Sequence, residues 1–321
     1  MRTAKRIVAA LVCLAVLLAV PFSFGCARQA DGVEILCTAF PIYDWAKNVL
    51  GESDGVTLSL LVENGTDMHS FQPSFMDVAK IKRCDVLILV GGESDMWVAE
   101  AASEDTTVIR LSELEGITLY EVSAQSGAHD HGDEHVHTEE HDHAFDEHLW
   151  LSVANAKVAS SAICDAICSL DSGNQDVYKK NLENFSEKLS LLDEKFREVT
   201  DGVDGALIFA DRFPFVYLFE DYDLEYYAAF EGCTTDTSAD FETVVRLARA
   251  ADGQRGRWVL VTESSDRALA ESVIRAAARD DLEIRALDSM QSLTAADIKN
   301  GATYMGIMES NLKVLEEILN F

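Results

Sequence analysis

Short apolar segments alternate with helical segments along most of this chain, and this alternation limits the fold more than any other feature. Strands and helices that follow one another in series are typical of a parallel sheet covered by helices on both faces. The segments that we expect to form strands are residues 33–39, 57–64, 85–92 and 106–111 in the first half, and 206–210, 224–230, 258–263 and 282–288 in the second. The sequence therefore predicts an α/β fold with two sets of parallel strands.

A long amphipathic stretch separates the two sets of strands. NQDVYKKNLENFSEKLSLLDEKFREV, residues 174–199, places Leu and Phe at helical spacing. We therefore expect two β/α lobes, each with a mostly parallel sheet, joined by one long rigid helix. The predicted divisions are a signal peptide at 1–25, an N-terminal lobe at 26–171 with a His-rich loop at 121–147, the linking helix at 172–201 and a C-terminal lobe at 202–321. A final helix is expected near 295–320.

The first 25 residues have the pattern of a secretion signal of the lipoprotein type. Arg2, Lys5 and Arg6 precede the apolar run IVAALVCLAVLLAVPFSF, and Gly25 stands directly before Cys26. A small residue before a cysteine resembles a lipobox, which predicts Cys26 as the lipidated first residue of the mature protein. An ordinary signal or a retained anchor helix is the alternative. In each case we expect an extracytoplasmic protein, lipid-anchored to the outer face of the cytoplasmic membrane or periplasmic.

Acidic residues strongly outnumber basic ones. The chain has 56 Asp and Glu against 26 Lys and Arg, and its formal charge is −30. The signal segment carries three positive charges and no acidic residue, so the mature chain stands near −33. Such a surface repels phosphate backbones, and we expect no nucleic-acid partner. It attracts cations, although many secreted proteins are acidic for solubility alone.

The cysteines do not form a recognisable zinc motif. Beyond Cys13 and Cys26, five cysteines remain, so at least one is unpaired within the chain. Cys164 and Cys168 are four residues apart in a helical pattern, where they either share a metal or act as small core residues. No CxxC pair occurs, and a thiolate zinc site is not indicated.

Histidine is distributed very unevenly. The stretch HDHGDEHVHTEEHDH, residues 129–143, holds six of the eight histidines together with six acidic residues. Its low hydrophobicity and dense charge predict a loop rather than a packed element. Neutral imidazoles bind metal above about pH 6.5, so we expect this loop to collect metal ions and to release them on acidification. Its histidines are His129, His131, His135, His137, His141 and His143.

The two remaining histidines lie where an α/β sheet binds its ligands. His69 follows a predicted strand, and His148 follows the His-rich loop. Ligands of open α/β sheets bind beyond the carboxyl ends of the strands, so these two side chains are candidates for one metal site. The second lobe has no histidine, and carboxylates must supply its ligands. Asp211 and Asp288 each follow a predicted strand there, although a carboxylate in this position also caps helices.

Four motifs in this order resemble the metal-binding lipoproteins of ABC importers, the zinc and manganese solute-binding proteins. They are DMHSFQPS; the acidic His-rich insertion followed by DEHLWLS; IFADRFPFVYLFEDYDL; and LDSM followed by NGATYMGIMESNLKVLEEIL. The resemblance covers nearly the whole mature chain. It implies a cleft between two lobes that holds one divalent cation, with partners in an ABC permease and its ATPase.

The resemblance also implies the ligands. His69 and His148 match the first-lobe positions, and Asp288 matches the fourth position. At the third position zinc-type members carry His, whereas this chain reads Ala210-Asp211-Arg212. We assign that role to Asp211, with Glu231 as the substitute if Arg212 pairs with Asp211. Oxygen-rich sites suit Mn²⁺ and imidazole suits Zn²⁺, so Zn²⁺ is the expected cargo and Mn²⁺ the alternative.

Other functions remain as alternatives. A catalytic zinc needs an open coordination position and a positioned acid or base, and neither HExxH nor GxSxG occurs, so an enzyme is not expected. A metal-dependent adhesin or a metal chaperone would share the ion site. The aromatic segment 209–230 is expected to line the core of the second lobe rather than a sugar or peptide site.

Overall fold

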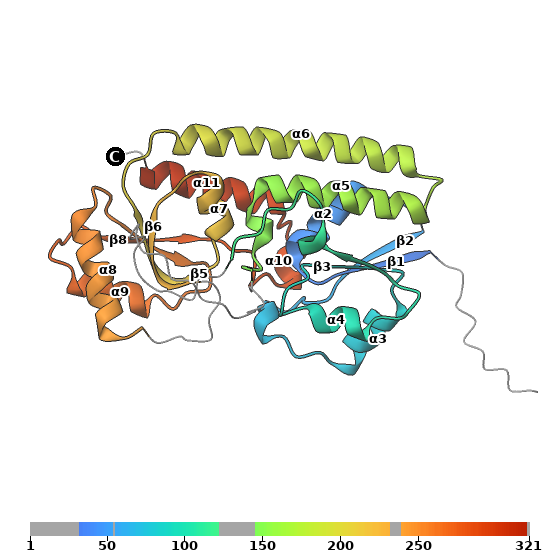
Figure 1. Cartoon of the computed structure of the whole chain (residues 1–321), viewed down its shortest axis with the longest axis horizontal. Helices are drawn as coiled ribbons and strands as arrows, with labels where there is room; N and C mark the ends of the chain where they lie inside the picture. Colours follow the sequence, from blue (N-terminus) through green and yellow to red (C-terminus); the bar gives the residue numbers. More distant parts are fainter. Residues whose placement is uncertain (1–31, 54, 122–144, 232–238, 320–321) are drawn as a thin grey trace, which may run out of the picture. The chain divides into compact units, whose positions relative to one another are not determined.

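A computed structural model of the chain describes residues 32–53, 55–121, 145–231 and 239–319, apart from the side chain of Glu231. The predicted signal segment, Cys26, Cys233 and all six histidines of the His-rich loop lie outside the described residues. Residues from Val33 onward form one unit of closely contacting elements. Figure 1 shows two sheets in this unit, with helices packed around them.

The first sheet is entirely parallel and has the order β2-β1-β3-β4. Its strands are β1 (Val33–Cys37), β2 (Val56–Leu60), β3 (Val86–Leu89) and β4 (Thr107–Arg110). The helices between them are α2 (Phe40–Leu50), α3 (Phe75–Arg83) and α4 (Met96–Ala101), and short 3₁₀ turns lie at η1 (Met68–Ser70) and η2 (Leu111–Glu113).

The second sheet repeats this arrangement with the order β6-β5-β7-β8, again all parallel. Its strands are β5 (Leu207–Phe213), β6 (Tyr226–Glu231), β7 (Trp258–Thr262) and β8 (Glu283–Leu287). The helices that follow its strands are α7 (Val216–Asp221), α8 (Phe241–Gly253) and α9 (Ala268–Ala276), with α10 (Ala295–Lys299) and α11 (Tyr304–Leu319) after the last strand. The two predicted parallel-sheet lobes are thus confirmed.

Sequence signals explain where several helices begin and end. Pro41 lies in the first turn of α2, and Gly51 ends that helix with a φ of 61°, which favours glycine. Ser74 and Asp77 form a capping box at the start of α3. Asp240 accepts a hydrogen bond from the amide of Thr243 at the start of α8.

The central strands β3 and β7 are buried on both faces, and alternate residues of the first sheet enter different cores. Ile35 and Ile88 face a large hydrophobic cluster that also includes Phe209 of the second sheet, whereas Leu36 and Leu87 face a smaller cluster under α3 and α4. The large cluster runs through both lobes. Its aromatic members from the segment 209–230 confirm that this segment lines the core; they are Phe209, Phe213, Phe215, Tyr217, Phe219 and Tyr222.

Two long helices, α5 (Val153–Leu170) and α6 (Gln175–Thr200), follow η3 (Leu149–Leu151) and pack against each other. Helix α6 contacts both lobes. Its Asn181 donates to the carbonyl of Val49 in α2 at 3.0 Å, and its Phe196 stacks on Tyr222 of the second lobe with ring centroids 4.9 Å apart. Helix α5 is long and apolar enough to cross a membrane by length and composition alone, but it contributes Ile163 to the core.

Two sequence expectations need correction. The single helix near 295–320 is divided into α10 and α11, because Gly301 adopts a φ of 98° directly after the Asn300 cap. Asp211 does not follow the first strand of the second lobe but lies inside β5. A shift in the pairing register between Phe209 and Arg212 marks a bulge, which bends the strand and extends it past Asp211.

Candidate metal centre

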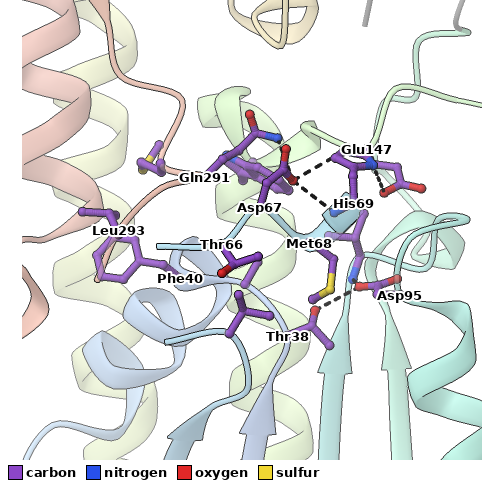
Figure 2. Close-up of a pocket in the computed structure, with 15 residues that line it drawn as sticks. Thr38, Phe40, Thr66, Asp67, Met68, His69, Asp95, Glu147, Gln291 and Leu293 are labelled. Carbon is purple, nitrogen blue, oxygen red and sulfur yellow. Dashed lines mark hydrogen bonds and ion pairs between the residues drawn. The ribbon is translucent and has the colours of Figure 1, made fainter. Parts of the chain in front are cut away.

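A small cavity lies beyond the carboxyl ends of the first-sheet strands and is closed by a loop of the second lobe. Residues from both lobes line it, including Asp67, His69, Glu147, Trp150 and Gln291 (Figure 2). The space inside it that water can enter is about 30 Å³, which is enough for a water molecule or a single ion.

His69 is held in the short turn η1. Asp67 caps this turn, because its Oδ1 accepts the backbone N–H of His69 at 3.1 Å. The Nδ1 atom of His69 lies 2.5 Å from Ser94 Oγ and 3.9 Å from Glu147 Oε2. The Nε2 atom lies 4.0 Å from Asp67 Oδ1. The imidazole is therefore held at Nδ1 and presents Nε2 toward Asp67.

His148 is buried and firmly oriented, with only 1% of its side chain exposed. One oxygen of Asp146, Oδ1, accepts from the backbone N–H of His148 at 2.9 Å and lies 2.7 Å from its Nδ1. A carboxylate at Nδ1 fixes the proton there and leaves the lone pair on Nε2, as is common for metal-binding histidines. Tyr217 of the second lobe supports this turn by donating to the carbonyl of Asp146 at 2.6 Å.

The two histidines lie side by side although they are far apart in the sequence. Their ring centroids are 5.7 Å apart at an interplanar angle of 45°. The indole of Trp150 packs edge-on against His148 at 5.2 Å, and its N–H donates to the carbonyl of Ser289 in the second lobe at 3.0 Å. This contact ties the histidine turn to the loop that closes the cavity.

Gln291 is a site residue that sequence reasoning missed. Its amide nitrogen lies 2.5 Å from Nε2 of His148 and 3.5 Å from Oδ1 of Asp67. Figure 2 shows Gln291 and Asp67 directed toward each other across the cavity. An uncharged amide has no signal of its own in the sequence, but its position three residues after Asp288 in LDSMQS would have pointed to it.

Arg212 reaches the same place from strand β5. Its guanidinium Nη1 lies 3.8 Å from Asp67 Oδ2, so an ion pair links the second lobe to the turn that carries His69. The sequence raised the alternative that Arg212 pairs with Asp211. The contact between those two residues is instead a hydrogen bond from the backbone N–H of Arg212 to Asp211 Oδ1 at 2.8 Å. An arginine side chain has no acceptor atom and cannot ligate a metal.

Asp211 has other partners. Its Oδ2 accepts from the hydroxyl of Thr262 at 2.8 Å and from the Thr262 backbone N–H at 3.2 Å. Thr262 ends the neighbouring strand β7. Asp211 is not among the residues that line the cavity, and neither is His148. The side chain of its substitute, Glu231, lies outside the described part of the chain.

Asp288 follows β8 directly, as expected, but does not line the cavity. Its Oδ1 accepts from the backbone N–H of Met290 at 2.8 Å, and its own N–H donates to Asn311 Oδ1 at 2.8 Å. Burial, followed by the nearby Glu263 carboxylate, raises the pKa of Asp288 to about 6. Its visible role is to shape the loop that carries Gln291.

The ends of the His-rich segment lie close to the histidine site. Glu121 and Phe145 form an antiparallel bridge, and the N–H of Asp146 donates to the carbonyl of Tyr120 at 2.8 Å. The described part of the fold stops at Glu121 and resumes at Phe145, which is one residue before Asp146 and three residues before His148. His129 to His143 themselves lie outside the described residues.

The described residues contain no ready-made cluster of three or more His, Cys, Asp or Glu side chains that could hold a metal. Cys164 and Cys168 lie with their Sγ atoms 3.9 Å apart, and Cys164 is buried in the large hydrophobic cluster. They fit the interpretation as core residues. Within the described residues, His69 and His148 are the two histidines that lie next to each other.

Comparison with known proteins identifies the family of the chain. The sequence model of the family "Zinc-uptake complex component A periplasmic" (ZnuA) matches residues 35–318. The zinc-binding lipoprotein AdcA of Streptococcus pneumoniae is 28% identical over 294 residues, which is 90% of this chain and 56% of that protein. The chain thus spans about half the length of this curated relative.

Two further matches cover their counterparts more fully. The high-affinity zinc uptake system protein ZnuA of Bacillus subtilis is 24% identical over 293 residues, 91% of this chain and 89% of that protein. The crystal structure of the Zn(II)-bound ZnuA-like domain of Streptococcus pneumoniae AdcA has the same fold, with a TM-score of 0.68, 23% identity and coverage of 90% of this chain and 100% of that one. Because the family model spans nearly all of the described residues, the chain belongs to the family of the periplasmic component A of zinc-uptake complexes.

Proposed function

We propose that this protein captures one Zn²⁺ ion outside the cytoplasm and delivers it to an ABC permease for import. The observation that carries the proposal is the pair His69 and His148, whose rings lie 5.7 Å apart, with His69 lining the small cavity. Two neutral imidazoles are the ligands that suit zinc, and the cavity next to His69 has room for an ion.

His148 is the better prepared ligand of the two. Asp146 holds its Nδ1 at 2.7 Å, so Nε2 is directed to the site before any ion arrives. Outer-shell carboxylates of this kind increase the basicity of the ligating nitrogen and reduce the ordering that binding requires. His69 lies on a more exposed turn, with 27% of its side chain exposed, and is the ligand through which an ion enters or leaves.

The His-rich segment is proposed to collect zinc for this site. Glu121 and Phe145, which flank the residues outside the described fold, form a bridge close to His148. Ions bound weakly by the six histidines are held on the same chain as the cavity, and we expect this to increase their effective concentration there. Acidification protonates the imidazoles and discharges these ions.

The cell-surface partners follow from the family and from the N-terminal sequence. We propose that Cys26 carries a lipid that anchors the protein to the outer face of the cytoplasmic membrane, and that an ABC permease with its ATPase receives the ion. Docking to the permease opens the cavity. Helix α6 is hydrogen-bonded to α2 and stacks on Tyr222 of the second lobe. We therefore expect small shifts between the lobes rather than a wide hinge motion.

The enzyme alternative has lost its support. The family to which the chain belongs is a zinc-binding component of an uptake system and not an enzyme. Manganese remains the alternative cargo, because carboxylate oxygens of Asp67 and Glu147 lie within about 4 Å of the His69 ring nitrogens.

Metal binding by a shortened chain tests the proposal. Residues 27–321 without 129–143 are stripped of metal, offered equal Zn²⁺ and Mn²⁺, and weighed by native mass spectrometry. The deletion lies beyond the Glu121–Phe145 bridge and leaves the described fold connected. One bound zinc, lost in His69→Ala and in His148→Ala, is the expected result. One bound manganese would change the cargo, and no bound ion would contradict a site at these histidines.

A further inference from the structure

Asp67 lies next to three side chains of the site, those of His69, Gln291 and Arg212. Its Oδ1 is 4.0 Å from Nε2 of His69 and 3.5 Å from the amide nitrogen of Gln291. That nitrogen lies 2.5 Å from Nε2 of His148. The amide group of Gln291 therefore lies between Asp67 and His148, and the same Asp67 oxygen is the one nearest to Nε2 of His69.

The chemistry of this arrangement is that of a cation site. The Asp146 carboxylate keeps the proton of His148 on Nδ1, so Nε2 is an electron-pair donor. Asp67 offers a second electron-pair donor, its carboxylate oxygen. The amide –NH₂ of Gln291 carries a partial positive charge and faces both. A neutral donor group placed between two such atoms occupies the position that a metal ion would take.

Arg212 compensates the charge of Asp67 from the other side. Its guanidinium lies 3.8 Å from Oδ2, and Asp67 is only 17% exposed while Arg212 is 37% exposed. A largely buried carboxylate next to neutral imidazoles needs such a partner. A divalent ion would take over this role and would also repel the guanidinium.

Resting on the proposed function, we infer that Asp67 is a third ligand of the bound ion, and that Gln291 and Arg212 hold its carboxylate until the ion arrives. On binding, the amide of Gln291 moves aside and Asp67 turns from the guanidinium to the metal. Two ligand atoms on one tetrahedral zinc are about 3.3 Å apart. The observed 4.0 Å between Asp67 Oδ1 and His69 Nε2 needs only a small rotation of the side chain.

If Asp67 is a ligand, the two single variants of its ion pair with Arg212 should change the zinc Kd in opposite directions. Asp67→Asn keeps an oxygen that can cap η1 but removes the charge, and we expect its zinc Kd to be weaker by more than about tenfold. Arg212→Gln removes the competitor of the metal, and we expect its zinc Kd to be tighter by about two- to fivefold. In the double variant, the gain from Arg212→Gln disappears. A purely structural ion pair would instead weaken binding in both single variants.

The experiment uses the chain 27–321 without 129–143, after its thermal unfolding has been matched to that of the undeleted chain. Zinc Kd is measured by competition with a chromophoric chelator. Co²⁺ is then substituted for zinc, because its visible absorption changes when a ligand is lost. Exposed Asp105→Asn and Arg257→Gln, which pairs with Glu283 away from the cavity, serve as matched controls and should bind like wild type.

The measurements distinguish a failure of the proposed function from a failure of Asp67 as a ligand. If the parent chain binds no zinc, the proposed function fails and the inference fails with it. If the parent binds zinc and His69→Ala abolishes binding, but Asp67→Asn stays within about twofold of the parent with an unchanged Co²⁺ spectrum, only the third ligand is overturned. Should Asp67→Asn not fold, Arg212→Gln decides alone: a tighter Kd supports the inference and a weaker or unchanged one contradicts it.

Discussion

The amide nitrogen of Gln291 lies 2.5 Å from Nε2 of His148, across 143 residues of sequence. This contact joins the C-terminal lobe to the buried histidine of the N-terminal lobe. It also requires Nε2 to act as the acceptor, which is the state in which an imidazole binds a metal. Asp146 maintains that state by holding Nδ1, and the histidine is therefore prepared for an ion.

Replacing Asp146 tests this preparation. Asp146→Asn keeps an oxygen for the backbone N–H of His148 but removes the charge next to Nδ1. We expect the zinc Kd to weaken by about 10- to 100-fold, which is typical for loss of an outer-shell carboxylate. Isothermal titration with zinc measures this, and Asp165→Asn on the exposed side of α5 is the control. Equal affinities for the two variants would show that Asp146 does not tune the site.

The carboxylates assigned from the sequence give a second prediction. Asp211 is bonded to Thr262, and Asp288 to the amide of Met290. Because both carboxylates serve the local structure, Asp211→Asn and Asp288→Asn should change the zinc Kd by less than about twofold. Asp211→Asn should also lower the free energy of unfolding by about 1 kcal/mol, since it weakens hydrogen bonds to a charged acceptor. A large loss of zinc affinity in either variant would restore that carboxylate as a ligand.

Tyr304 gives a prediction on stability. This residue is fully buried, packs edge-on against Trp45 at 5.3 Å, and donates its hydroxyl to the carbonyl of Trp150 at 2.9 Å. Tyr304→Phe leaves that carbonyl without this donor in the core. We expect a loss of about 1–2 kcal/mol in the free energy of unfolding, measured with urea. The half-buried Tyr227→Phe is the comparison, and a loss of similar size there would argue against the role of the buried hydroxyl.

Asp44 predicts a dependence of stability on pH. It is 2% exposed, and its Oδ2 accepts the N–H of Tyr304 at the start of α11. Burial raises its pKa above the ordinary value of 3.8, although the Tyr304 N–H opposes this shift. The folded protein therefore holds the proton to a higher pH than the unfolded chain does. This group's contribution to the free energy of unfolding accordingly falls as pH rises from 3.8 through the raised pKa.

Asp44→Asn cannot titrate and removes this decline. Urea unfolding of wild type and variant between about pH 3 and pH 7 should show the variant gaining stability relative to wild type as pH rises. The exposed Asp105→Asn should follow the wild-type curve. Parallel curves for wild type and Asp44→Asn would mean that Asp44 ionises in the folded state as it does in the unfolded chain.

The strands were predictable because each is a continuous apolar run between turn residues, and buried parallel strands need no other signal. The bulge at Asp211 was not, because it arises from the pairing of β5 with β6 and has no local sequence mark. The division between α10 and α11 could have been predicted, because Asn300-Gly301 is a residue pair that commonly ends a helix.

The candidate site divides in the same way. His69 and His148 stood out because histidine is otherwise confined to the His-rich segment. Gln291 and Arg212 did not stand out, because glutamine and arginine are common on protein surfaces and neither residue type marks a metal site by itself. Their importance comes from contacts with His148 and Asp67 that only the folded chain creates.

The position of the bound ion tests the account most directly. Crystals of the zinc-loaded chain 27–321 without 129–143, measured at the zinc absorption edge, would locate the metal by anomalous scattering. We predict one peak at about 2.0–2.1 Å from Nε2 of both His69 and His148. A peak held by Asp211 and Asp288 instead, or no ordered zinc near the two histidines, would contradict the site described above.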